Sequence, residues 1–442
     1  MRRLAGISEL KILIASHRYF LASGPERYFF NVTDQLQAAG HEVVPFSVRY
    51  DGNRATPYAD YFVSPIGEDS QTYLREYRNS ARAVFKSFER LFYSREVERA
   101  VARLAEDTQP DIAYVLYFLR KLSPSVLVGL KGRGIPLVAR LSDYGLFCSE
   151  HHCFRAGQPC TRCIDGNFFH AALHGCVKGS RVLSFASATA LAFQHWRGYF
   201  DLIDHFVVTN DFMKDTMIRA GFPAGKMTTI RTFTDLTAFL PGRGVPEDPY
   251  MLWLARLDRP KGFHVLLEAL SRLKRERSLP RLLVAGDGHD LAYVSEIRAA
   301  VERLGLADTV TFLGNVSGDK VADLLRSALF MISPALWFEN LPNTVVEALA
   351  SGTPVIASDI GSLACTLTHE VDSLLCRPGD PADFAEKIAR LLDDPALRAQ
   401  LSAGARRTAE RHHSAAGHIE ALLGLFDDLR RRPSRQGDVS PA

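Results

Sequence analysis

The 442-residue sequence lacks any long apolar run, and this places the first limit on what the protein can be. A helix that spans a membrane needs about 18 consecutive apolar residues, and no segment approaches that length. The N-terminal segment KILIAS is short and predicts a first strand rather than a signal peptide. We therefore expect a cytoplasmic protein, in which cysteines serve as thiols, ligands or catalysts rather than disulfides.

The sequence also lacks an excess of charge of either sign. Lysine and arginine total 53, aspartate and glutamate total 50, and the formal net charge is +3. Proteins that bind nucleic acid usually carry a marked basic excess, so no nucleic-acid partner is expected. Apolar residues make up 47% of the chain, which is enough to fill the cores of two domains of about 200 residues each.

Short apolar segments alternate with helical patterns along nearly the whole chain. Segments such as HEVVPFS, DIAYVLY and YMLWLA are apolar on both faces, as buried parallel strands require. Helical patterns between many of them are typical of βαβ units. We expect an α/β protein in which two doubly wound, Rossmann-like domains face each other across a cleft, with ligands bound at the carboxyl ends of the strands.

A segment rich in proline and glycine at 240–249 interrupts this alternation and predicts a linker. An N-terminal Rossmann-like domain is expected over 1–240, with a cysteine-rich insertion at 148–176. A C-terminal Rossmann-like domain is expected over 245–410. A helix at 411–432 is expected to pack back on the first domain, and 433–442 is expected to be a disordered tail.

The most informative segment covers residues 329–359, where a strand, a loop and a helix follow one another. Glu339 lies in the loop, and Glu347 lies one turn into the helix, which Asn343 is expected to cap. Free backbone N–H groups around Asn343 and Thr344 predict an anion site suited to a diphosphate. A carboxylate one turn further along can accept hydrogen bonds from a ribose diol.

The pattern Glu-x7-Glu followed by EALASGTPVIASDIG resembles the signature of the retaining glycosyltransferases of family 4, or group 1, which have the GT-B fold. In that family the first glutamate, here Glu339, contacts the donor sugar, and the second, here Glu347, holds the ribose. The resemblance therefore implies a nucleoside-diphosphate sugar, such as a UDP- or GDP-sugar, as donor.

A basic loop in the second half agrees with this resemblance. Arg256 and Lys261 follow a strand, and two cations there can neutralise a departing diphosphate. They match the family's Arg-x4-Lys element. Gly286 corresponds to a family glycine that shapes the nucleotide pocket, and Val316 lies where the family's backbone meets the base.

Two segments of the first half each allow two interpretations, one functional and one structural. Gly24 matches a family loop whose backbone contacts the donor phosphate; a plain turn is the alternative. Relatives often carry His-Asp where this chain has Ser142 and Asp143. A serine cannot act as a base at neutral pH without help, so we assign Asp143 to orient the acceptor, with a turn or cap residue as the alternative.

Retaining enzymes of this type are thought to use the leaving phosphate oxygen as the base. No Asp-x-Asp motif is present, so no catalytic metal is expected.

Five of the seven cysteines fall between residues 148 and 176. Their spacing, which includes a Cys-x-x-Cys pair, is typical of a four-thiolate structural zinc site. The ligands expected for zinc are Cys148, Cys160, Cys163 and Cys176. An iron–sulfur cluster and a regulatory disulfide are the alternatives.

Residues 71–95 have apolar residues at helical spacing with basic residues between them. One interpretation is an ordinary outer helix of the first domain. The other is a helix that lies on an anionic membrane surface, which would make the protein peripheral at the inner face of the plasma membrane.

Taken with the resemblance, these patterns predict transfer of a hexosyl unit to a glycan or polyprenyl-linked acceptor in cell-surface polysaccharide synthesis. A nucleotide-sugar epimerase on the same fold and a catalytically inactive nucleotide-sugar-binding subunit are the alternatives.

Overall fold

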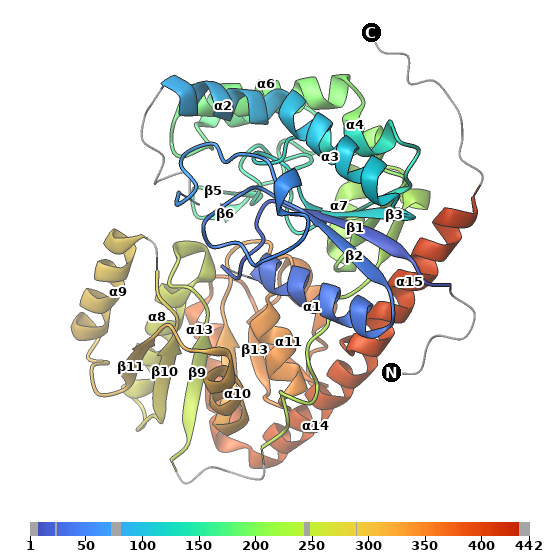
Figure 1. The fold of residues 1–442 in the computed structure, drawn as a ribbon. Helices are drawn as coiled ribbons and strands as arrows, with labels where there is room; N and C mark the ends of the chain where they lie inside the picture. The colour runs from blue at the N-terminus through green and yellow to red at the C-terminus, as the bar shows by residue number, and fades with distance from the viewer. Residues whose placement is uncertain (1–7, 23, 72–80, 243–247, 289, 433–442) are drawn as a thin grey trace.

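The computed structural model describes residues 8–22, 24–71, 81–242, 248–288 and 290–432, which form two parallel six-stranded sheets (Figure 1). Helices cover both faces of each sheet. This confirms the expected fold class of two Rossmann-like α/β domains. Among the described residues, no helix combines the length and the apolar composition needed to cross a membrane.

The first sheet has the strand order β2-β1-β3-β4-β7-β8, and all of its neighbouring strands run parallel. Its strands are buried on both faces because helices cover both sides. The strands are β1 (Lys11–Ser16), β2 (Glu42–Phe46), β3 (Ile112–Tyr117), β4 (Leu137–Arg140), β7 (His205–Val208) and β8 (Met227–Thr229). The helices of this half are α1 (Gly24–Ala38), α2 (Ala81–Phe92), α3 (Arg95–Thr108), α4 (Ser125–Lys131), α5 (His170–His174), α6 (Arg181–Trp196) and α7 (Asp211–Arg219).

The second sheet has the order β11-β10-β9-β12-β13-β14 and is also parallel throughout. Its strands are β9 (Tyr250–Leu254), β10 (Arg281–Ala285), β11 (Val310–Gly314), β12 (Ala328–Ser333), β13 (Val355–Ser358) and β14 (Ser373–Cys376). The helices are α8 (Phe263–Lys274), α9 (Leu291–Arg303), α10 (Gly318–Ser327), α11 (Asn343–Ala350), α12 (Gly361–Thr366), α13 (Pro381–Asp393) and α14 (Pro395–His412).

The last helix, α15 (Ala415–Arg431), leaves the second half and packs on the first. Its buried residues Leu422 and Phe426 share one apolar cluster with Ile12 of β1 and Tyr114 of β3. His418 of the same helix is hydrogen-bonded to Tyr28 of α1 at 2.9 Å. The C-terminal segment thus completes the core on one face of the first sheet.

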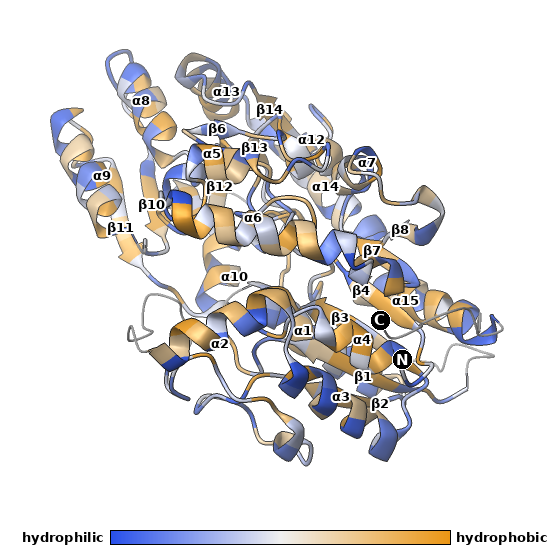
Figure 2. Cartoon of the chain, turned by 90° about the horizontal axis from the view of Figure 1, so that it is seen from above, coloured by the Kyte–Doolittle hydropathy of each residue, from blue (hydrophilic) through white to orange (hydrophobic). Residues whose placement is uncertain are grey.

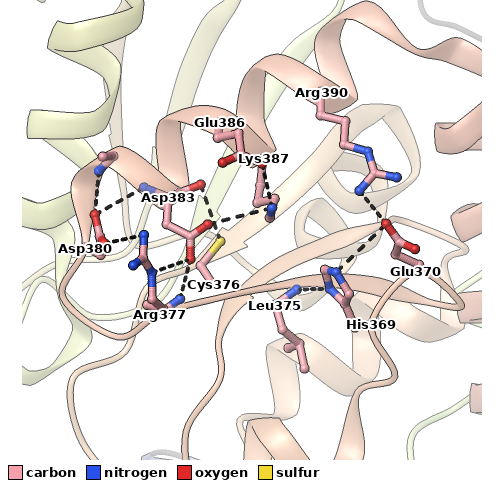
Figure 3. Close-up of polar contacts among 11 residues, drawn as sticks. His369, Glu370, Leu375, Cys376, Arg377, Asp380, Asp383, Glu386, Lys387 and Arg390 are labelled. Carbon is pink, nitrogen blue, oxygen red and sulfur yellow. Dashed lines mark hydrogen bonds and ion pairs between the residues drawn. The ribbon is translucent and has the colours of Figure 1, made fainter.

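Short polar contacts fix the turn between β14 and α13, as Figure 3 shows. Asp380 caps α13 by accepting hydrogen bonds from the backbone N–H groups of Ala382 and Asp383 at 2.9 and 3.2 Å. The Asp383 carboxylate accepts a hydrogen bond from the backbone N–H of Arg377 at 2.7 Å. This network orders the turn and contains none of the predicted site residues.

The segment 71–95 differs from the expectation of one amphipathic helix with a basic face. The described part forms α2 and the start of α3, and residues 72–80 lie outside the described residues. Arg90, one of the basic residues of this segment, is fully buried and donates hydrogen bonds to Ser94 and Glu96 at 2.9 Å. A buried guanidinium needs such partners, so Arg90 joins α2 to α3 instead of facing outward. The tail expected to be disordered also lies outside the described residues.

Candidate functional site

The helix that carries Glu347 begins one residue earlier than the sequence predicted. Pro342 occupies the N-cap position and Asn343 is the first residue of α11, so the expectation that Asn343 caps the helix is wrong. Proline suits this position because it has no N–H to leave unpaired. Leu341 precedes it with a φ of 87°, a strained value for a leucine. Asn343 and Thr344 therefore both lie in the first turn, where backbone N–H groups are free.

Glu347 is a buried carboxylate held by a cation from the other half of the chain. It is 3% exposed, and its Oε1 accepts a hydrogen bond from Arg27 of α1 at 2.6 Å. Burial raises the pKa of the Glu347 carboxyl, and Arg27 opposes that rise. Its Oε2 is buried and has no hydrogen-bond partner. A buried oxygen of this kind is costly unless a ligand satisfies it.

Glu339 is also buried and forms a compact polar group with two neighbours. Its Oε1 accepts hydrogen bonds from Lys261 Nζ at 2.5 Å and from Trp337 Nε1 at 2.7 Å. Lys261 can reach it because the chain turns sharply at Gly262. A Cβ at Gly262 would lie 1.9 Å from the carbonyl oxygen of Pro334, and its φ is 77°, so only glycine fits there.

Arg256 and Lys261 line one cavity of about 620 Å³, a volume typical of a small-molecule site. The opposite wall of this cavity comes from the cysteine-rich segment of the first half, including His152, Arg155 and His174. The His152 ring lies 5.2 Å from the Trp337 ring. The cavity is therefore built by both halves, and its charged lining consists of Arg155, Arg256 and Lys261 together with Glu150 and Asp258. Arg256 forms an ion pair with Asp258 at 3.1 Å.

The remaining predicted donor residues lie around the same loops. A Cβ at Gly24 would lie 3.2 Å from Asn343 Nδ2, so the start of α1 approaches the start of α11. Gly286 has a φ of 131°, and a Cβ there would lie 2.1 Å from the carbonyl oxygen of Ala255, next to Arg256. Val316 packs against the apolar cluster that includes the buried residues of α11.

Asp143 has both carboxylate oxygens engaged within the first half. Oδ1 accepts a hydrogen bond from the backbone N–H of Gly145 at 2.8 Å. Oδ2 is hydrogen-bonded to the Tyr117 hydroxyl and lies 3.0 Å from His151 Nδ1. Although burial opposes it, the charge and hydrogen bond of His151 hold the pKa of Asp143 well below its usual value. Ser142 accepts a hydrogen bond from Arg140 at 2.9 Å.

Three residues of the site were missed from the sequence. Arg27 pairs with Glu347, and His151 pairs with Asp143. Asn340 fastens the loop before α11 to the first half, because its side chain donates to the carbonyl oxygen of Leu141 at 3.0 Å and accepts from the Thr209 hydroxyl at 2.6 Å. Arg27 and Asn340 contact residues far away in the sequence, and His151 contacts Asp143 within an irregular loop. Neither kind of contact produces a sequence pattern that could have predicted it.

The cysteines of the insertion converge on one place in the structure. One small pocket is lined by all five, Cys148, Cys153, Cys160, Cys163 and Cys176. Among the described residues, no three His, Cys, Asp or Glu side chains are grouped so that they could hold a metal ion, and the zinc site stays a prediction. A hydrogen bond from the Cys153 thiol lowers the pKa of Cys148 to about 6.

Comparison with known families covers most of the chain in two parts. Residues 22–238 match the family described as Glycosyltransferase Family 4, and residues 242–408 match the family described as Glycosyl transferases group 1. D-inositol 3-phosphate glycosyltransferase 2 of Catenulispora acidiphila is 29% identical over 249 residues, which cover 52% of this chain and 58% of that protein. The chain spans about half the length of the curated relatives it matches.

Solved structures with the same fold cover nearly the whole chain. Sucrose-phosphate synthase from Thermosynechococcus elongatus has a TM-score of 0.71 at 21% identity, covering 95% of this chain and 99% of that one. Anabaena HepE in complex with UDP-glucose has a TM-score of 0.63 at 17% identity, covering 95% and 100%. At these identities the likeness establishes the GT-B fold.

Proposed function

The chain belongs to the group 1 glycosyltransferases of family 4, and from this membership we propose that it transfers a hexosyl unit from a nucleoside-diphosphate sugar, with retention of anomeric configuration. We further propose that the acceptor is a glycan or a polyprenyl-linked oligosaccharide in cell-surface polysaccharide synthesis. A UDP-sugar is the first donor to test, because the HepE structure of the same fold contains UDP-glucose.

The observation that carries the proposal is the state of Glu347. Its Oε2 is buried without a partner, and its Oε1 is held by Arg27. A ribose diol supplies a hydroxyl donor that would satisfy Oε2. The free N–H groups in the first turn of α11, beside Glu347, suit the anionic diphosphate.

Arg256 and Lys261 have a role toward the leaving group in this proposal. Arg256 and Lys261 line the cavity between the halves and would stabilise the negative charge that develops on the diphosphate as the bond to the sugar breaks. Lys261 also holds Glu339 in place, so that this carboxylate would bind a hydroxyl of the donor sugar. In this arrangement the departing phosphate oxygen takes the acceptor proton, and the protein positions the groups.

Asp143 has a positioning role in this proposal. Its oxygens are engaged by Gly145, Tyr117 and His151, so it would orient the His151 ring rather than bind the acceptor directly. The cysteine-rich segment forms one wall of the cavity through His152 and Arg155, and we propose that the acceptor enters along this wall.

The decisive experiment measures donor binding by thermal shift with UDP-, GDP- and ADP-sugars. A ligand at 100 times its Kd stabilises the folded state by about 2.7 kcal/mol, so one donor class should raise the melting temperature by several degrees. Glu347→Gln should reduce the shift, whereas Glu302→Gln, an exposed glutamate of α9 in the same half, should leave it unchanged. Absence of any shift, or an equal shift in Glu347→Gln, would contradict the proposed role of Glu347.

Product analysis then separates transfer from its alternatives. A transferase consumes donor only when an acceptor is supplied, whereas an epimerase converts donor without one. An inactive binding subunit would bind the donor and convert nothing with any acceptor in the panel.

A further inference from the structure

Large apolar side chains are exposed together on three helices of the first half. We define the apolar platform as six residues that are 56–78% exposed: Phe85, Phe88, Leu173, Val182, Phe185 and Trp196. They belong to α2, α5 and α6. Scattered exposed apolar residues are normal, but a contiguous group of this size marks an interaction surface.

Aromatic contacts show that α2 and α6 form one continuous surface. The Phe88 ring lies 4.5 Å from Phe92, the Phe92 ring 5.8 Å from Phe193, and the Phe193 ring 6.0 Å from Trp196. The Gln194 side chain also donates a hydrogen bond to the backbone oxygen of Leu91 at 2.7 Å. In Figure 1 these two helices lie side by side at the end of the first half that faces away from the second.

An aromatic contact also links the α5 end of the platform to α6. The Phe169 ring, just before α5, lies 5.8 Å from the Phe185 ring of α6. Figure 2 looks down on this end of the molecule and shows apolar segments along α6 and, alternating with polar ones, along α2. Along α6, Val182, Phe185 and Trp196 recur at spacings that place them on one helix face.

The charges around the platform select the kind of partner. From Gly166 to Phe200 the sequence contains no aspartate or glutamate. Exposed cations flank the apolar residues, namely Arg82, Lys178, Arg181 and Arg197. In α2, Glu89 is the one acid, and its carboxylate accepts a hydrogen bond from the Ser94 hydroxyl at 2.7 Å. Apolar side chains bordered mainly by cations are typical of helices that lie in the headgroup region of an anionic bilayer.

We propose that the apolar platform docks this protein on the surface of a bilayer containing anionic phospholipids. Phe85, Phe185 and Trp196 would enter the boundary between headgroups and acyl chains, while Lys178 and Arg181 contact phosphate groups. Leu173 of the platform is followed by His174, which lines the cavity containing Arg256 and Lys261. The α5 end of the platform therefore lies beside that cavity. The inference does not depend on the transfer activity.

Co-sedimentation with vesicles tests the platform. The full chain should bind vesicles of phosphatidylglycerol and phosphatidylcholine at low salt, and bind vesicles of phosphatidylcholine alone at least tenfold more weakly. The double variant Phe185→Ser/Trp196→Ser should lose at least tenfold of this binding. The control Leu291→Ser removes an equally exposed apolar residue, 75% exposed, from α9 of the other half and should bind as the wild type does.

A second variant separates the charge contribution from folding defects. Lys178→Ser/Arg181→Ser should reduce binding to anionic vesicles severalfold without changing the melting temperature. The proposal is overturned if the wild type binds no vesicles, or if the Phe185→Ser/Trp196→Ser variant binds as well as the wild type. It is also overturned if the wild type is a dimer that this variant dissociates, because a second copy would then cover the platform.

Discussion

At the scale of single residues, the site is defined by buried charged groups whose partners come from elsewhere in the chain. Glu339 and Glu347 were identified from the sequence, because a long ordered motif surrounds them. Arg27 was not identified, although it contacts Glu347 directly. An isolated arginine in a helix has no pattern that distinguishes it from a solvated surface charge.

Buried histidines make the stability of the fold depend on pH. His418 donates from Nδ1 to the Arg231 carbonyl oxygen at 2.8 Å, and its Nε2 lies 2.9 Å from the Tyr28 hydroxyl. Burial lowers the pKa of His418 to about 3, and burial likewise lowers the pKa of His413 to about 4. Below pH about 6.5 these histidines therefore bind protons in the unfolded state but not in the folded state.

We expect the free energy of unfolding to fall as the pH drops below about 6.5, by up to roughly 1.4 kcal/mol per pH unit for each such histidine. Urea denaturation between pH 7.5 and 5 measures this slope. His418→Gln should lower stability at neutral pH and make the slope shallower. A variant slope equal to that of the wild type would show that His418 is not the neutral, buried group described here.

At the scale of secondary-structure elements, α15 illustrates a helix whose amphipathic pattern is evident in the sequence and whose target is not. Phe426 is fully buried against the first sheet, in the cluster that includes Ile12 and Tyr114. Gly424 lies in the same helix and has open space around it. The two positions therefore respond to substitution in opposite ways.

Phe426→Ala should destabilise the protein by about 3–5 kcal/mol, because it removes a buried ring and leaves a cavity. Gly424→Ala should stabilise it by about 0.5–1 kcal/mol, because alanine restricts the unfolded chain and nothing obstructs its methyl group. Chemical denaturation of both variants measures these changes. If Phe426→Ala had little effect, α15 would not be part of the core of the first half.

At the scale of the whole molecule, the two halves are joined at the candidate site itself. Asn340 contacts Thr209 and Leu141, and Tyr144 donates to the backbone oxygen of Glu339 at 3.4 Å. The loop that carries Glu339 is thus held by the first half as well as by the second. Its position depends on how the halves meet.

Asn340→Ala should lower the free energy of unfolding by about 1–3 kcal/mol, because the Leu141 carbonyl oxygen loses its side-chain donor and the Thr209 hydroxyl loses its stronger acceptor. It should also speed backbone hydrogen exchange around Thr209 and in the loop before α11. Asn340→Asp keeps the acceptor for Thr209 but sets a carboxylate oxygen against the Leu141 carbonyl oxygen, so it should also be destabilising. Exchange unchanged in Asn340→Ala would mean that the halves meet without this contact.

The sequence by itself determined the two parallel sheets and the loops that hold Glu339, Glu347, Arg256 and Lys261. Buried parallel strands need continuous apolar segments, and a strand-to-helix loop needs particular residues at fixed spacing. Both requirements are local and can be read along the chain.

Only the tertiary structure decided which residues meet across the gap between the halves. The pairing of Arg27 with Glu347, the burial of Arg90 and the continuous surface of α2 and α6 depend on contacts between distant segments. No repeat spacing encodes such contacts, because they follow from the way whole elements pack. The sequence placed five cysteines in one insertion, and the structure shows that all five line one small pocket.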